Sequence, residues 1–166
     1  MLGEPSTAIS DRLLRIEYCQ VITIPRFAAQ AIKKVAEIGW KPFHLLVRIS
    51  NSVGSTLKPA GPEISEGIIS TAFAKDPTDP PWMDDPAYRA WAAFVDKYYP
   101  NGDQMTTFTV VGHLSARTLV EVLKQCGDDL TPENTMRQAA NLHALQLGML
   151  LAGITLNVAP SDFVPL

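Results

Sequence analysis

The feature that most constrains the fold is a largely apolar run, FHLLVRI, at residues 43–49. Pro42 precedes this run, and a stretch rich in Ser, Gly and Pro follows it over residues 50–62. Such a run is typical of a strand in a parallel sheet that is covered on both faces. Because neighbouring parallel strands need long, usually helical connections, the run predicts an α/β fold, with residues 50–62 as a loop.

The segments on either side of this run complete an α/β order. VITI (21–24) predicts a short strand that Pro25 stops, and GIISTAF (67–73) predicts another buried strand. Apolar residues recur at helical spacing over residues 28–38, and Gly39 is placed to end that helix in the left-handed conformation. The order is therefore strand, helix, strand, connection, strand.

The second half of the chain predicts three helices and a strand. Asp85 and Pro86 suit the N-cap and the first position of a helix, and Gly127 suits a helix end. The apolar face of the first helix would comprise Tyr88, Trp91, Val95 and Tyr98. The expected elements are helices at about 86–99, 109–125 and 131–140, and a half-buried strand at 154–158.

Composition excludes several classes of protein. The chain has 166 residues, 46% hydrophobic and 19% charged, which is ordinary for a globular domain. Its net charge of −3, without a basic cluster, excludes nucleic acid as a partner, because phosphate contacts need clustered Lys and Arg. No apolar stretch approaches the ~20 residues that span a bilayer. Glu4 and Pro5 stand where a secretory signal needs positive charge, so the sequence by itself predicts a cytoplasmic chain.

No motif indicates catalysis, a metal or a cofactor. The adjacent carboxylates at 84–85 and 128–129 stand at helix boundaries, where Asp caps helices, and do not converge from separate elements. His44 and His143 have no Cys, Asp or Glu at ligand spacing. The sequence also lacks G-x-S-x-G, G-x-x-x-x-G-K and a G-x-G-x-x-G after a strand. We therefore expect a protein that is not an enzyme and holds no cofactor.

Six segments, taken in order, carry a family resemblance. They are FAAQAIKKVAEIGWKP, SVGSTLKPAG, EGIISTAFAKDPTDPPW, FVDKYYPNGD, LVEVLKQCGDDLTPENTMRQAANL and GMLLAGITLNVAPSDF. From about Thr23 to Leu166 the sequence resembles type I periplasmic solute-binding proteins of ABC importers. Within that class it is similar to the Leu/Ile/Val-binding-like group and its relatives for aromatic acids.

The resemblance implies a partial type I periplasmic-binding-protein fold, in which two α/β lobes close on a ligand about a hinge. Residues 23–105 would belong to the second lobe and residues 106–150 to helices of the first. Residues 151–166 would return to the second lobe, and residues 1–22 do not match. Because most of the first lobe's sheet would precede this sequence, we expect a truncated C-terminal half. Its helices at 109–142 would expose apolar surface and self-associate.

The resemblance also implies a function. The intact family delivers a small organic acid or amino acid to an ABC permease in the periplasm, by hinge closure and without catalysis. An alternative is a cytoplasmic ligand-sensing or protein-interaction module built on the same half-fold, and a non-functional remnant is another. An enzyme of the flavodoxin-like sort has only the α/β order in its favour, and fold does not imply function.

Candidate ligand-binding residues follow the predicted strands, where open α/β sheets bind ligands. The first loop holds Thr23 and Phe27, and free N–H groups at the helix start after it suit a carboxylate or carbonyl. The second loop holds Ser50, Asn51 and Ser52; its alternative reading is an ordinary polar turn.

In amino-acid-binding relatives an acidic residue of the second loop can hold the ligand's ammonium group, and the resemblance aligns the neutral Asn51 with it. This favours a carboxylic acid that lacks an α-amine. His113, at the start of the long helix, corresponds to a position near the hinge and cleft of the family. Its alternative reading is a helix-start or interface histidine.

Overall fold

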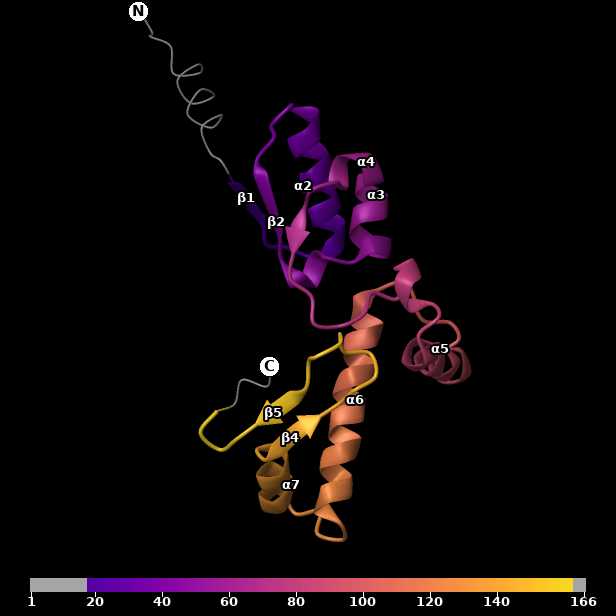
Figure 1. Ribbon diagram of the computed structural model, residues 1–166, viewed down its shortest axis with the longest axis vertical. Helices are drawn as coiled ribbons and strands as arrows, with labels where there is room; N and C mark the ends of the chain where they lie inside the picture. The colour runs from indigo at the N-terminus through magenta and orange to yellow at the C-terminus, as the bar shows by residue number, and fades with distance from the viewer. Residues whose placement is uncertain (1–17, 163–166) are drawn as a thin grey trace, which may run out of the picture. The chain divides into compact units, whose positions relative to one another are not determined.

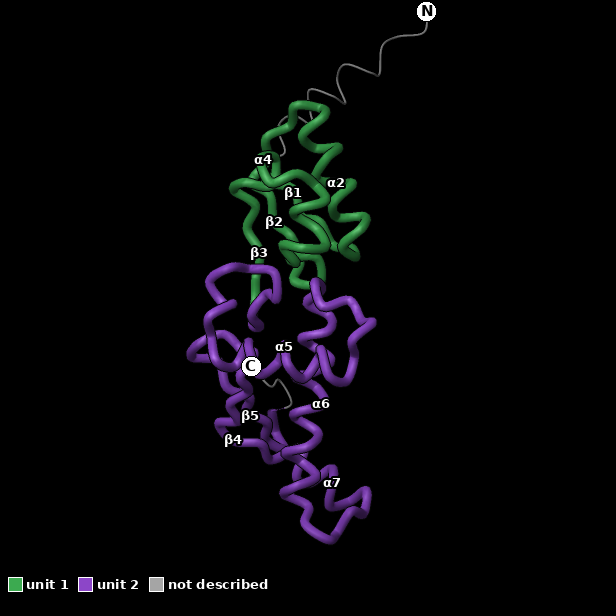
Figure 2. Tube along the Cα trace, turned by 90° about the vertical axis from the view of Figure 1, so that its right-hand side faces the viewer, with its two compact units in different colours: residues 1–72 green, residues 73–166 purple. Residues whose placement is uncertain are grey.

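The computed structural model describes residues 18–162, so the predicted leader at 1–22 lies largely outside the described residues. The chain divides into two compact units, unit 1 up to Ala72 and unit 2 from Phe73 onward (Figure 2). Both units combine helices and strands, which confirms the predicted α/β class. The assignment of residues to the two lobes of the intact family stays a prediction.

Unit 1 contains a parallel sheet of three strands in the order β1-β2-β3. The strands are β1 (Tyr18–Val21), β2 (Phe43–Leu46) and β3 (Ile69–Ser70). Val21 pairs with Leu46, and Leu45 pairs with Ile69. The predicted sheet is therefore present, although β1 lies three residues earlier than expected and β3 is shorter.

The shift of β1 has its cause in α2 (Pro25–Glu37), which begins three residues earlier than predicted. Pro25 occupies the first turn of this helix, where its missing N–H costs no hydrogen bond. The sequence interpretation treated Pro25 only as a strand stop, and residues 22–24 instead form the turn into the helix. At the other end Gly39 has a φ of 69°, as predicted for a residue that ends a helix.

The segment at 50–62, which was predicted as a loop, is mostly helical. It contains η1 (Arg48–Ser50), the π-helical turn η2 (Val53–Leu57), α3 (Lys58–Ala60) and α4 (Pro62–Ser65). The Ser52 side chain caps η2, and the prolines of α3 and α4 lie in their first turns, where proline is tolerated. The loop prediction was wrong because Ser, Gly and Pro also start and separate short helices.

The core of unit 1 lies between one face of the sheet and its helices. Val21 and Leu46 pack against Ala28 of α2 on that face, and Figure 1 shows α2, α3 and α4 on the same side of the strands. Tyr18, Phe43 and Ile69 are exposed on the other face. Within residues 18–162 the prediction of a sheet covered on both faces is therefore wrong.

Unit 2 contains the three predicted helices and one short helical turn. Asp85 caps the first helix as predicted, since its carboxylate accepts the backbone N–H groups of Ala87 (2.8 Å) and Tyr88 (3.1 Å). Gly127 follows the long helix with a φ of 59°. The bounds are η3 (Pro80–Trp82), α5 (Pro86–Tyr98), α6 (Thr107–Cys126) and α7 (Pro132–Ala139).

Two antiparallel strands, β4 (Leu142–Leu145) and β5 (Leu156–Val158), complete unit 2. β5 confirms the strand predicted at 154–158, whereas β4 lies where the sequence predicts no strand. Figure 1 shows both strands and α7 beside the C-terminal half of α6. Leu142 packs there against Val122 and Cys126 of α6, so the C-terminal half of α6 has a sheet partner of its own.

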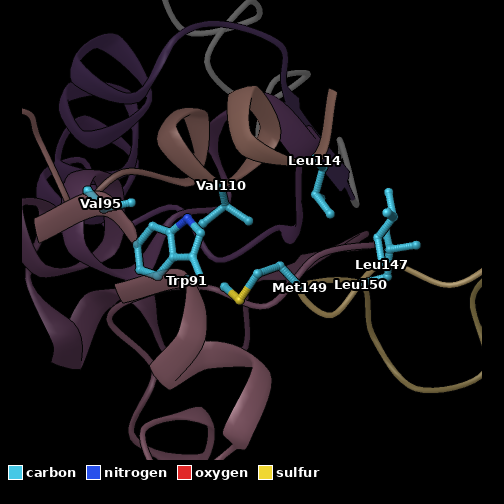
Figure 3. Close-up of a cluster of buried hydrophobic side chains, with 7 residues drawn as sticks. All are labelled: Trp91, Val95, Val110, Leu114, Leu147, Met149 and Leu150. Carbon is cyan, nitrogen blue, oxygen red and sulfur yellow. The ribbon is translucent and has the colours of Figure 1, made fainter. Parts of the chain in front are cut away.

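The main core of unit 2 surrounds Trp91, whose side chain is only 2% exposed. In Figure 3 the indole lies beside Val110 of α6 and Met149. Val95 is buried with it, as predicted for the apolar face of α5. Tyr98 was assigned to the same face but is 64% exposed, because the core ends one turn earlier.

A buried lysine ties the start of α5 to the core of unit 2. The Lys75 ammonium donates to the Asp85 carboxylate (2.9 Å) and to the carbonyl of Gly148 (2.8 Å). The pKa of Asp85 is lowered, first by the hydrogen bond from Lys75 and next by that from the backbone of Tyr88. Lys75 is itself 7% exposed, so it depends on this carboxylate for its counter-charge.

The Asp85 carboxylate should make unit 2 sensitive to acid. A group whose pKa is lower in the folded chain stabilises the fold above its ordinary pKa, and that stabilisation disappears as the pH falls through the folded pKa. We expect Asp85→Asn, which keeps the cap but loses the charge, to flatten the fall of unfolding temperature between about pH 5 and about pH 2. Asp84→Asn, at the exposed neighbouring position, is the control, and an equal flattening there would contradict the assignment to Asp85.

Candidate functional site

The three parallel strands of unit 1 end at one edge of the sheet, and the residues that follow them are joined by hydrogen bonds. We call the residues at 22–24, 47–52 and 71–72 the crest loops. The Ser50 hydroxyl donates to the carbonyl of Thr23, which joins the first two loops. The Asn51 side-chain amide donates to the carbonyl of Thr71 (2.8 Å), which joins the second and third. The crest loops therefore form one connected surface.

The structure brings the five predicted residues of unit 1 together at this edge, but with different exposure. Ser50 and Ser52 are fully buried. The Ser50 hydroxyl is used on Thr23, and the Ser52 hydroxyl accepts the backbone N–H of Ser55 (3.3 Å). These two side chains consequently fix the shape of the second loop. Thr23 and Asn51 are half-buried and Phe27 is exposed, so these three are the ones that solvent reaches.

The start of α2 offers fewer free donors than predicted. Pro25 has no N–H, and the N–H groups of Phe27 and Ala28 both donate to the carbonyl of Ile24 (3.1 Å each). The positive end of the helix dipole nevertheless faces the crest loops. A ligand here would meet the dipole and side chains more than a row of free N–H groups.

Arg26, in the first turn of α2, was missed by the sequence interpretation. Its side chain is exposed, and no acidic residue lies in that turn. A cation at the positive end of a helix is electrostatically unfavourable, whereas an anion there is stabilised. The signal in the sequence is an arginine directly after a proline that begins a helix. The combination makes the first crest loop a place for a negatively charged group.

His113 lies in unit 2, on α6, and the other five predicted residues lie in unit 1. Its ring meets that of Phe94 edge-on, with the centroids 5.0 Å apart. Both residues line a cavity of about 290 Å³ among α5, α6 and residues 146–149. Burial, and secondarily the charge of Arg117, lowers the pKa of His113, so its imidazole is neutral at pH 7.

The two remaining histidines have different surroundings. His44 is buried in β2, as its place in an apolar run predicted. His143 is exposed in β4, and its Nε2 lies 2.9 Å from the side-chain oxygen of Asn141. Within residues 18–162 no three His, Cys, Asp or Glu side chains are placed to hold a metal ion. The same part of the chain contains no helix long and apolar enough to cross a membrane.

The fold defines a class of protein, the open α/β domain, and the crest loops lie where that class generally binds ligands, beyond the carboxyl ends of the strands. Within that class the chain belongs to the periplasmic binding protein family, whose model matches residues 14–157. The resemblance stated from the sequence is therefore confirmed. No curated protein matches the sequence.

Solved structures with the same fold are Leu/Ile/Val-binding-type and related periplasmic proteins. A substrate-binding periplasmic protein from Ralstonia solanacearum has a TM-score of 0.74 at 17% identity over 96% of this chain and 44% of its own. A branched-chain amino acid ABC transporter protein from Thermus thermophilus, with bound valine, has a TM-score of 0.73 at 19% identity, over 94% and 42%. An extracellular ligand-binding receptor from Verminephrobacter eiseniae has 0.68 at 22%, over 94% and 42%. The chain thus spans less than half the length of these proteins.

Proposed function

We propose that the chain binds a small carboxylic acid or an amino acid at the crest loops of unit 1, as part of the solute-binding component of an ABC importer. The observation that carries the proposal is the exposed Arg26 in a first helical turn without an acidic residue, next to three loops joined by hydrogen bonds. A guanidinium binds a carboxylate through two parallel hydrogen bonds, and the helix dipole adds to the attraction. Binding of this kind needs no catalytic group.

The second loop favours an acid without an amine. Asn51 is neutral and its amide is already bonded to the carbonyl of Thr71. An ammonium group prefers a carboxylate, and Asn51 supplies none. The Thermus thermophilus protein was solved with valine, which keeps α-amino acids among the ligands to be tested.

Family membership supports the wider role. The proposed location is the periplasm, and the proposed partner is an ABC permease. The ligand would favour the closed arrangement of two lobes by contacting both of them. His113 of α6 stays a proposed ligand contact, argued from its place in unit 2 alone.

The test is a thermal melt of the purified chain with valine, leucine and benzoate. Ligand at about 100 times its Kd adds about 2.7 kcal/mol, which raises the unfolding temperature by several degrees. We expect benzoate to give the larger shift. Arg26→Gln should remove most of it, while Lys33→Gln, on the same helix, should leave it unchanged. A melt that no compound shifts would refute the proposal.

The exposed sheet face favours a second candidate, a protein-interaction module. Tyr18, Phe43 and Ile69 are exposed apolar residues on one face of the sheet. Exposed apolar patches mark association sites. A sharp melt indifferent to all ligands, together with self-association in sedimentation velocity that Phe43→Ser reduces, would support this alternative; a monomer at all concentrations would contradict it.

A further inference from the structure

The cavity of about 290 Å³ that His113 lines lies within unit 2. Residues of α5 and α6 form two of its walls, and residues 146–149 form the third. The wall on α5 includes the small side chains of Ala87 and Ala90, which leave the space open. Gly148 allows the third wall to approach α5, because a Cβ at this glycine would lie only 2.7 Å from the Cβ of Ala87. The cavity therefore results from the packing of unit 2 itself and needs no residue of the crest loops.

Much of the wall is apolar. The ring of Phe94 lines the cavity and is 47% exposed, so an apolar group placed there would cover it. A volume of about 290 Å³ lies just below the range of about 300–1,000 Å³ of pockets for drug-sized ligands, so an occupant would be no larger than a small ring compound. The other large apolar side chains of the wall also belong to the buried cluster of Figure 3: Trp91, Leu114, Leu147 and Met149.

Two polar side chains of α6, those of His113 and Arg117, line the cavity from one helix face, since they are four residues apart. The ring nitrogens of His113 have no hydrogen-bond partner among residues 18–162, and neither nitrogen is buried, so solvent reaches both. Burial, and next the charge of Arg117, lowers the pKa of His113. Its ring is therefore neutral at pH 7, and one of its nitrogens carries an N–H that can be donated to a ligand.

The charge of the site comes from Arg117, whose side chain is 53% exposed. Its guanidinium lies 3.7 Å from the Glu121 carboxylate, which is longer than a hydrogen bond. Glu121 instead accepts a hydrogen bond from Lys124 at 2.9 Å, and this bond is the first cause of its lowered pKa. Within the described part of the chain no acidic side chain lines the cavity. The site is therefore positive, and a guanidinium and an N–H on one helix face suit a carboxylate.

We propose that this cavity is a second binding site, for a small carboxylate with a compact apolar body. The carboxylate binds Arg117 and the ring N–H of His113, and the apolar body lies against Phe94. The site goes beyond the proposed transport function, because every residue that it needs belongs to unit 2. It can therefore be present whether or not the crest loops bind a ligand.

The test uses benzoate, with benzamide as the matched compound of the same shape without the charge, added to the full chain and followed by NMR. We expect benzoate to shift the ring signals of His113 and the methyl signal of Met149. It should bind about tenfold more tightly than benzamide, the ratio expected for a hydrogen bond to a charged group. A bound carboxylate favours the protonated imidazole, so saturating benzoate should also raise the pKa of His113. Unchanged His113 signals at millimolar benzoate, or equal affinities for the two compounds, would overturn the proposal.

Two variants separate the charge from the cavity. Arg117→Gln should bring the ratio of benzoate to benzamide affinity close to one, while Arg89→Gln, at an exposed arginine of α5 outside the cavity, should leave it near ten. Ala90→Leu fills the cavity from an exposed position of α5 and should block both compounds. Its control is Ala93→Leu, at an exposed position of the same helix outside the cavity. Binding that survives Ala90→Leu would place the ligand elsewhere and overturn the proposal.

One further variant distinguishes this site from the crest loops, where benzoate is also expected to bind. Arg26→Gln should remove the benzoate-dependent rise in unfolding temperature that the crest loops cause, and should leave the shifts of His113 and Met149 unchanged. Failure of the crest-loop proposal would therefore not affect these signals. If Arg26→Gln abolished the shifts of His113 and Met149, they would report on the crest loops, and the second site would be refuted.

Discussion

Truncation of Trp91 to alanine should lower the free energy of unfolding of unit 2 by about 3–5 kcal/mol. The indole is 2% exposed and belongs to the cluster in Figure 3, where it lies near Val95, Val110 and Met149. Truncation removes these contacts and leaves a void that α5 and α6 cannot both close. The indole N–H is buried without a partner in the described part of the chain, and its loss offsets some of the cost. We therefore expect a value near the lower end.

The measurement is urea unfolding followed by circular dichroism, with hydrogen exchange of the amides of α6 to locate the effect. Tyr98→Ala, seven residues later on the same helix, is the control. Tyr98 is 64% exposed, so its truncation should cost about 0.5 kcal/mol or less. If the two variants lost similar amounts of unfolding free energy, Tyr98 would be packed as tightly as Trp91. The apolar face predicted from the sequence, which includes both residues, would then be right and the exposed position of Tyr98 wrong.

The helix boundaries were predictable because residues with one strong backbone preference mark them. Asp85 with Pro86, Thr131 with Pro132, and Gly127 each stand where the structure starts or ends a helix. Proline gave a wrong prediction where it can either end a strand or begin a helix. Pro25 begins α2, although it was read as the stop of a strand. In every case the residue itself marks a boundary between elements. Whether a strand ends or a helix begins at that boundary depends on the neighbouring residues.

Elements that depend on tertiary pairing were not predictable. β4 has four residues, two of which, His143 and Ala144, are exposed, and it becomes a strand by pairing with β5. No periodic pattern of that length distinguishes a strand from a connection. The short helical turns at 48–65 were not predictable either, because capping and packing against α2 define them and no apolar period does.

The place of the candidate site was predictable, and its inner arrangement was not. Strand ends predict the crest loops, because parallel strands end together. Burial of the Ser50 and Ser52 hydroxyls could not be read from the sequence, because serine in an irregular segment faces either way. Asn51 between them points its amide to Thr71 across the loops. Only the structure distinguishes the buried side chains that fix the shape of the loop from those that solvent reaches.

Ile32→Ala should destabilise unit 1 by about 2–5 kcal/mol. Ile32 is 1% exposed and packs against Ala29 and Ala60, which are too small to fill the space that the truncation leaves. The vacated volume would also join a neighbouring cavity of unit 1, which Ile32 lines, and so enlarge an existing defect. The loss should appear as weaker hydrogen-exchange protection of the amides of α2 and β2.

The control for this variant is Ile38→Ala at the end of α2, where the isoleucine is 59% exposed and the expected loss is about 0.5 kcal/mol or less. The two substitutions delete the same atoms, so their difference mainly measures burial, with a smaller gain at Ile32 from the higher helix propensity of alanine. It also tests the packing of α2 against α3 and α4, since Ile32 lies in one cluster with Ala60 and Ile64. If the two losses were equal, α2 would not be packed through Ile32.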